Sequence, residues 1–135
     1  MSTVARTLTV FLLIVLAETL HGVLRQLYLV PAIGDLPSRQ LGVFTGSLLI
    51  LVIATLTARW LALPDRRAQL QAGLLCVVLM IAFEAGLGFT LGYGSDRLLA
   101  DYDPARGGFM GFGMLVLLLA PMTGAAIRGK TRSAP

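Results

Sequence analysis

Apolar residues gather into four long stretches along the chain, and short polar segments separate them. Each stretch reaches the roughly 20 residues that a helix needs to cross a hydrocarbon core of about 30 Å. Inside lipid the backbone finds no water to hydrogen-bond, so a single chain of this kind crosses as α-helices. The pattern therefore predicts an all-α, integral membrane four-transmembrane-helix bundle that forms one domain over residues 1–135. The predicted helices cover about 5–30, 40–61, 68–93 and 107–127.

Composition narrows the class further. Of the 135 residues, 56% are hydrophobic and only 13% are charged, whereas a soluble domain carries about 25% charged residues. Together with a mean hydropathy of +0.82, these values exclude a disordered chain and an ordinary soluble enzyme. The net charge of +4 is spread over short loops, so we expect the lipid bilayer, and no nucleic acid, as a partner. The single cysteine, Cys76, excludes a disulfide framework and a CxxC motif.

Lysine and arginine are distributed unequally between the two sides of the predicted bundle, and their larger share marks the cytoplasmic side. One side holds seven: Arg6, Arg59, Arg66, Arg67, Arg128, Lys130 and Arg132. The other side holds four: Arg25, Arg39, Arg97 and Arg106. We therefore expect a multi-pass protein of a bacterial inner (plasma) membrane with both termini in the cytoplasm. No A-x-A cleavage site follows the first apolar stretch, so we expect an uncleaved helix rather than a signal peptide.

The two halves of the chain share the spacing of several rare residues. Glu18 and Gly22 lie 66 residues before Glu84 and Gly88. Three further matches have a spacing of 67: Pro37 with Pro104, Arg39 with Arg106, and Gly46 with Gly113. This pattern predicts two tandem helix hairpins, residues 7–62 and 68–128, related by an axis near the membrane normal. The alternative is a chance match between glycine-rich apolar helices.

Charged side chains inside the spans are the strongest candidates for function. Glu18 lies about 16 Å into the first helix, close to the midplane, and His21 and Arg25 follow at i+3 and i+7 on the same face. Glu84 lies roughly 24 Å into the third helix, near the level of His21 and Arg25. A charge at mid-bilayer costs about 3 kcal/mol, so these side chains must turn inward and find partners. One alternative is a structural salt-bridge network, in which Glu18 pairs with His21 or Arg25 and Glu84 pairs with Arg25 or an outer-loop arginine. The other is a polar site for protons, a cation or a small solute.

A metal site is the weaker interpretation of the same residues. Glu18-x-x-His21 has the spacing found in carboxylate-bridged di-iron bundles, but those sites need two such motifs and two further glutamates. The chain has one motif, one additional intramembrane glutamate, Glu84, and a single histidine. We therefore predict neither a metal nor a cofactor, with Glu18, His21 and Glu84 as the weak candidate ligands.

Charged residues also gather in the predicted outer loops. They include Arg39, Arg97, Arg106, Asp101 and Asp103. Opposite charges in such loops commonly pair with each other in solvent. The alternative is an outer vestibule whose arginines bind an anionic headgroup or solute through bidentate contacts.

Three Gly-x-x-x-Gly motifs predict where helix backbones approach closely. They are Gly42-x-x-x-Gly46, Gly88-x-x-x-Gly92 and Gly107-x-x-x-Gly111. These faces could serve the bundle itself, a homo-oligomer or a larger membrane complex. Pro121 predicts a kink in the fourth helix.

Four helices with a buried glutamate on the first form a plan similar to that of the small multidrug resistance transporters. The longer outer loops and the Glu18-x-x-His21 pair depart from that family, and its motif has no residue-by-residue match here. Two functions remain open: proton- or cation-coupled transport of a small solute, or a non-catalytic accessory or assembly subunit. No nucleophile and base at catalytic spacing and no phosphate-binding loop are visible, so an enzyme is less favoured.

Overall fold

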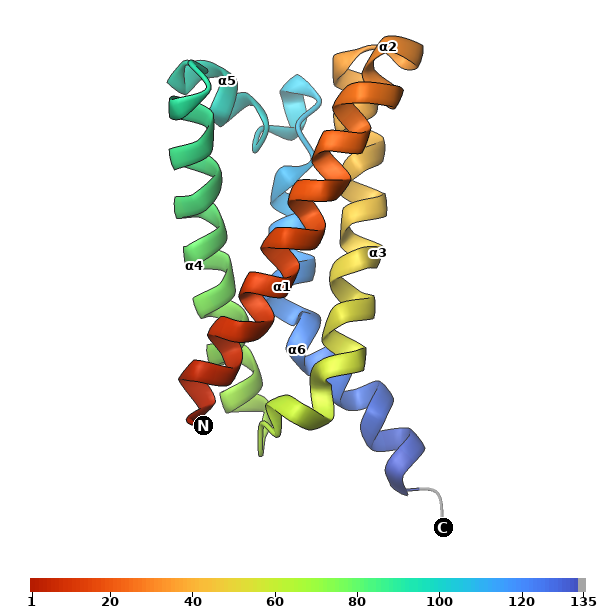
Figure 1. Ribbon diagram of the computed structural model, residues 1–135, viewed down its shortest axis with the longest axis vertical. Coiled ribbons are helices and arrows are strands. Elements are labelled where there is room, and N and C mark those ends of the chain that lie inside the picture. The colour runs from red at the N-terminus through yellow and green to blue at the C-terminus, as the bar shows by residue number, and fades with distance from the viewer. Residues whose placement is uncertain (134–135) are drawn as a thin grey trace.

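The computed structural model describes residues 1–133, with side chains up to residue 128, and these residues fold into a helical bundle (Figure 1). The elements in order are α1 (Thr3–Leu24), the π-helix η1 (Arg25–Leu29), α2 (Val30–Ile33), α3 (Asp35–Leu61), α4 (Arg66–Thr90), α5 (Ser95–Ala100), the 3₁₀ turn η2 (Pro104–Arg106) and α6 (Met110–Ser133). Within the described part of the chain, four helical segments are long and apolar enough to cross a membrane. Their outward side chains include exposed Leu16, Phe44 and Leu56. These features indicate a multi-pass membrane protein.

Local sequence explains where the helices begin and end. Ser2 and Asp65 accept hydrogen bonds from Ala5 N and Ala68 N, at 3.1 and 2.8 Å, and so cap the first turns of α1 and α4. A left-handed residue, Ala62 (φ 52°), ends α3. The short polar segment that follows lets the chain reverse into α4.

The first outer connection differs from the one expected. The first helix continues through η1 and α2 to Ile33, and a turn at Gly34 alone (φ 91°) leads into α3. The expected start of the second helix, near residue 40, was therefore wrong by five residues. Pro37 falls in the first turn of α3, where a missing N–H breaks no helical hydrogen bond.

The other expected boundaries shift by a few residues. The third helix ends at residue 90 instead of 93, and the fourth begins at residue 110 instead of 107. Between them, α5 and η2 form an ordered cap, which ends at Gly107 (φ 80°). The apolar pattern extended too far because glycines with positive φ interrupt the helix without interrupting the run of apolar residues.

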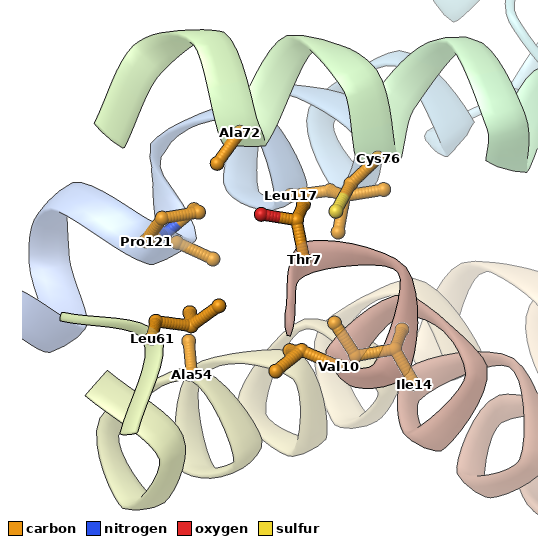
Figure 2. A pocket seen from close by; sticks show the side chains of 10 residues that line it. Thr7, Val10, Ile14, Ala54, Leu61, Ala72, Cys76, Leu117 and Pro121 are labelled. Carbon is orange, nitrogen blue, oxygen red and sulfur yellow. The ribbon is translucent and has the colours of Figure 1, made fainter. Parts of the chain in front are cut away.

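The bundle is tightly packed near the two termini. There α6 lies between α3 and α4, and α1 packs against both α3 and α4. Figure 2 shows the side chains that meet in this region, including Val10, Ile14, Ala54, Cys76 and Leu117. They leave a cavity of only about 10 Å³, about the smallest volume that holds one water molecule. The terminal end of the bundle is therefore sealed by an apolar core.

Close backbone approach occurs at different glycines from those predicted. A Cβ on Gly73 would overlap the carbonyl oxygen of Leu118, and a Cβ on Gly124 would lie 2.6 Å from the carbonyl oxygen of Ala54. These two glycines allow α6 to pack closely against α4 and α3. By contrast, Gly92 and Gly111, from two predicted motifs, have no neighbour within 4 Å. The predicted motifs were therefore wrong as markers of backbone packing inside this bundle.

α1 contacts α3 and α4 contacts α6, but the most extensive helix contact joins α3 to α6, across the two halves. The halves differ at the outer connection, which is a single glycine in the first half and includes α5 and η2 in the second. The duplication of the hairpins stays a prediction.

The N-terminus and the end of α6 lie at the same end of the bundle, opposite α2 and α5 (Figure 1). The charges that predict a cytoplasmic location for this end include Lys130 and Arg132, whose side chains lie outside the described residues.

We expect the variants Ser2→Cys and Ser95→Cys, made in a chain carrying Cys76→Ala, to react differently with a membrane-impermeant thiol reagent. In intact cells Ser95→Cys should be labelled and Ser2→Cys should not, because both positions are exposed but lie at opposite ends. Labelling of Ser2→Cys alone would reverse the orientation.

Candidate functional site

A cavity of about 920 Å³ lies in the half of the bundle that carries α2 and α5. Residues of α1, α3, α4, α5 and α6 line it, and most are apolar. The four residues predicted as an intramembrane polar site, Glu18, His21, Arg25 and Glu84, all line this one space. We call it the polar cavity.

The course of α1 explains why the cavity exists. α1 packs more extensively against α3 than against α4. Figure 1 shows α1 and α4 close together near the N-terminus and far apart at the end that carries α2 and α5. The result is a cavity that the apolar core around Ile14 and Leu117 closes toward the termini.

Two glycines of α3 make room for the charged side chains of α1. A Cβ on Gly46 would lie 2.7 Å from Glu18 Oε2, and a Cβ on Gly42 would lie 3.0 Å from Arg25 Cδ. The motif Gly42-x-x-x-Gly46 therefore forms a niche for polar side chains, where the sequence had predicted contact between helix backbones. The position of the Glu18 carboxyl depends on the missing side chain at residue 46.

Glu18, His21 and Thr45 form a short chain of polar groups. Glu18 Oε2 lies 3.9 Å from His21 Nδ1, and His21 Nε2 lies 2.6 Å from the Thr45 hydroxyl. That hydroxyl is also 3.3 Å from the carbonyl oxygens of Leu41 and Gly42, to which it can donate. When it does, His21 Nε2 donates to Thr45, and Nδ1 is the nitrogen free to take up or release a proton beside Glu18.

Arg25 does not pair with either glutamate, although the sequence had offered it as a partner for both. Its Nη1 donates to the Ser38 hydroxyl at 3.1 Å, and that hydroxyl donates to the carbonyl oxygen of Asp35 at 2.8 Å. Arg25 is also the first residue of the π-helix η1. The single wide turn there changes the direction of the side chains that follow, and such turns are frequent at functional sites.

Glu84 faces the polar cavity from α4 and finds its partner in the outer connection. The Tyr102 hydroxyl donates to Glu84 Oε2 at 3.4 Å. Partial burial raises the pKa of Tyr102, and the negative charges of Glu84 and Asp101 raise it further. Tyr102 therefore stays protonated and remains a hydrogen-bond donor to Glu84 at physiological pH.

The charged residues at the start of α3 and around α5 form a paired cluster at the end of the cavity near α2 and α5. Asp35 Oδ2 accepts from Arg39 Nε at 3.0 Å and from Arg97 Nη1 at 3.3 Å, and Arg39 also pairs with Asp101. Arg97 lies over the Tyr93 ring at 4.4 Å from its centroid. These contacts join the start of α3 to the segment that contains α5.

The predicted outer vestibule is only partly assembled. Arg39, Arg97 and Asp101 line the polar cavity, whereas Arg106 and Asp103 do not. Asp103 instead accepts a hydrogen bond from Ala105 N at 3.0 Å and caps η2, and Arg106 is exposed. The sequence placed these two residues in the same outer loop as Arg97 and Asp101. In the structure they lie on the turn η2 and its cap, outside the lining of the cavity.

Nothing in the described residues gathers three or more histidine, cysteine, aspartate or glutamate side chains into a possible metal site. Glu18 and His21 lie close together, but Glu84 does not complete a ligand group with them.

Three partners of the cavity's charged residues were missed from the sequence: Ser38, Thr45 and Tyr102. Ser38 and Thr45 lie three residues from Asp35 and Gly42 on the first half of α3, and small hydroxyl side chains are common on apolar helices without any polar role. Tyr102 lies beside Asp101 and Asp103, where it carries no distinguishing pattern. Only the fold brings it to Glu84.

Comparison with known proteins assigns no family: the chain matches no family model, no curated protein sequence and no solved structure.

Proposed function

We propose that this membrane protein binds a small solute with a cationic group in the polar cavity and couples its movement to protons carried by Glu18 and His21. The observation that supports this proposal is the joint exposure of two intramembrane carboxyl groups, Glu18 and Glu84, to one cavity of about 920 Å³. That volume falls within the range of small-molecule sites.

The two carboxyl groups have acceptor capacity that the bundle itself does not use. Glu18 Oε1 is buried and has no hydrogen-bond partner, and Glu84 accepts one long hydrogen bond from Tyr102. Within the side chains described, no arginine forms an ion pair with either glutamate. A buried acceptor without a partner is unfavourable by about 1–3 kcal/mol, so a cation or a proton would stabilise this end of the cavity.

His21 supports coupling to protons. It lies between the Glu18 carboxyl and the Thr45 hydroxyl, and histidine changes charge close to neutral pH. The positive charge of a bound solute and a proton shared by Glu18 and His21 would compete for the same space. A transporter that exchanges a solute for a proton requires such competition between them.

An accessory or assembly subunit is supported less well. The helix faces of this bundle that expose apolar side chains are expected of any membrane protein in contact with lipid. They therefore do not distinguish the two functions. An accessory subunit also gives no reason for a large cavity that exposes two intramembrane carboxyl groups, since a bundle built only for packing would close it.

Uptake by proteoliposomes tests the proposal. With tetramethylammonium as the probe and an imposed pH gradient as the driving force, we expect Glu18→Gln to lower uptake at least about tenfold, because the amide carries neither a negative charge nor an exchangeable proton. The control is Asp103→Asn, which makes the same chemical change outside the cavity and should retain uptake. Unchanged uptake by Glu18→Gln together with a lower unfolding temperature would show that the carboxyl is structural and contradict the proposal.

A further inference from the structure

We propose that the solute is a zwitterion, with its cationic group at Glu18 and its anionic group at Arg25, joined by an aliphatic spacer. This inference rests on the proposed function and deepens it, because it names the chemical class of the ligand. It follows from the distribution of charge within the polar cavity.

Three arginines gather at the end of the cavity near α2 and α5. Arg25, Arg39 and Arg97 share two aspartates, Asp35 and Asp101. Arg39 and Arg97 form ion pairs with these aspartates, whereas the hydrogen-bond partner of Arg25 is the neutral hydroxyl of Ser38. A guanidinium has five N–H donors in a planar fork that suits a carboxylate or a phosphate. Arg25 is thus the arginine of this cluster whose charge is not paired with a carboxylate, and its guanidinium can still bind an anion.

The deeper part of the cavity has the opposite character. Glu18 faces it from α1, and its carboxyl oxygen Oε1 is buried without a hydrogen-bond partner. A cationic group bonded to this oxygen would satisfy it through a charge-assisted hydrogen bond. Glu84 lies nearer the outer connection, where Tyr102 donates to it, and His21 is the titratable group beside Glu18.

His21 lies between Glu18 and Arg25 on α1, and most of the other residues that line the cavity are apolar. Val43, Met80, Phe83 and Met114 line it. Seven residues separate Glu18 from Arg25 on one helix, which corresponds to about 10 Å along the axis. A ligand whose charges lie on adjacent atoms cannot contact both ends, whereas a linear chain of several methylene groups can. The apolar lining favours such a spacer over a polar one.

Calorimetry on the purified protein in nanodiscs of phosphatidylglycerol provides the test. The zwitterionic probe is ε-aminocaproate, and hexylamine and hexanoate are probes of similar length that carry only one of its charges. We expect ε-aminocaproate to bind at least about tenfold more tightly than either, because it forms both charge-assisted interactions. Glycine, whose charges are too close together, should bind more weakly than ε-aminocaproate. Hexylamine binding as tightly as ε-aminocaproate would overturn the inference.

Substitutions then locate the anionic group. Arg25→Gln should lower the affinity for ε-aminocaproate to that for hexylamine while leaving hexylamine unchanged. Arg106→Gln, which removes an exposed arginine at the same end of the bundle, is the matched control and should change neither. Ser38→Ala removes the hydrogen-bond partner of Arg25 but not its charge, so it should retain the preference for the zwitterion. A preference that survives in a folded Arg25→Gln protein would refute the role of Arg25, and the wild-type probe series decides the ligand class if that variant does not fold.

The outcomes also separate this inference from the proposed function. If hexylamine binds in a Glu18-dependent way and ε-aminocaproate binds no better, the proposed function stands and the zwitterion is excluded. If none of the probes binds, both are excluded.

Discussion

Gly73→Ala is expected to destabilise the bundle by about 2 kcal/mol or more. The added Cβ would overlap the carbonyl oxygen of Leu118, a backbone atom that can move only if α4 and α6 separate. Overpacking of this kind costs about 1–3 kcal/mol and occasionally more. The unfolding midpoint in mild detergent, titrated with sodium dodecyl sulfate, measures the loss.

Gly86→Ala is the matched control because it places the same methyl group on the same helix. Nothing lies within 4 Å of a Cβ at Gly86, and alanine is favoured over glycine in a helix by up to about 1 kcal/mol. We therefore expect this variant to be as stable as the wild type or slightly more so. Equal stability of the two variants would contradict the close packing of α4 on α6.

Gly46→Ala is expected to weaken solute binding strongly while leaving the fold intact. Its Cβ would lie 2.7 Å from Glu18 Oε2, so the carboxyl group must leave its niche. The displaced atoms are the end of a flexible side chain, and a new rotamer relieves the overlap at small cost in stability. Affinity for a cationic probe should fall by at least about tenfold, as in Glu18→Gln, since a misplaced carboxyl no longer forms its charge-assisted contact.

The control for this variant is Gly113→Ala, at the position that the sequence pairs with Gly46. A Cβ at Gly113 would meet Val43 Cγ1 at 3.6 Å, which is ordinary van der Waals contact. Binding and stability should both stay close to the wild-type values. Full binding by Gly46→Ala would mean that the Glu18 carboxyl does not need its niche, and the proposed site would lose its structural basis.

These two glycines illustrate the limit of sequence reasoning in this protein. Gly46 belongs to a Gly-x-x-x-Gly motif and Gly73 does not, yet Gly73 supports backbone packing and Gly46 accommodates a carboxyl group. A glycine in the sequence records only that a side chain is missing. The neighbouring helix decides whether backbone, a polar side chain or open space lies in front of it.

The charged residues show the same limit of sequence reasoning. Spacing of three and seven residues along one helix placed Glu18, His21 and Arg25 on one face, and the structure places all three on the polar cavity. Their partners were not predictable, because Ser38, Thr45 and Tyr102 come from other elements. The expected pairing of Arg25 with a glutamate was wrong, since η1 and the start of α3 bring Ser38 closer.

The sequence by itself determined that the described chain forms four apolar helices of membrane-spanning length, because burial of backbone groups in lipid requires helices and the length of each apolar run limits its span. The sequence also determined which charges lie within those helices. The tertiary structure alone decided that α1 diverges from α4, that a cavity opens between them, and that the core near the termini seals it. The physical reason is that apolar periodicity specifies a helix but not its neighbours: in lipid every helix face can be apolar, so side-chain fit between helices sets their arrangement.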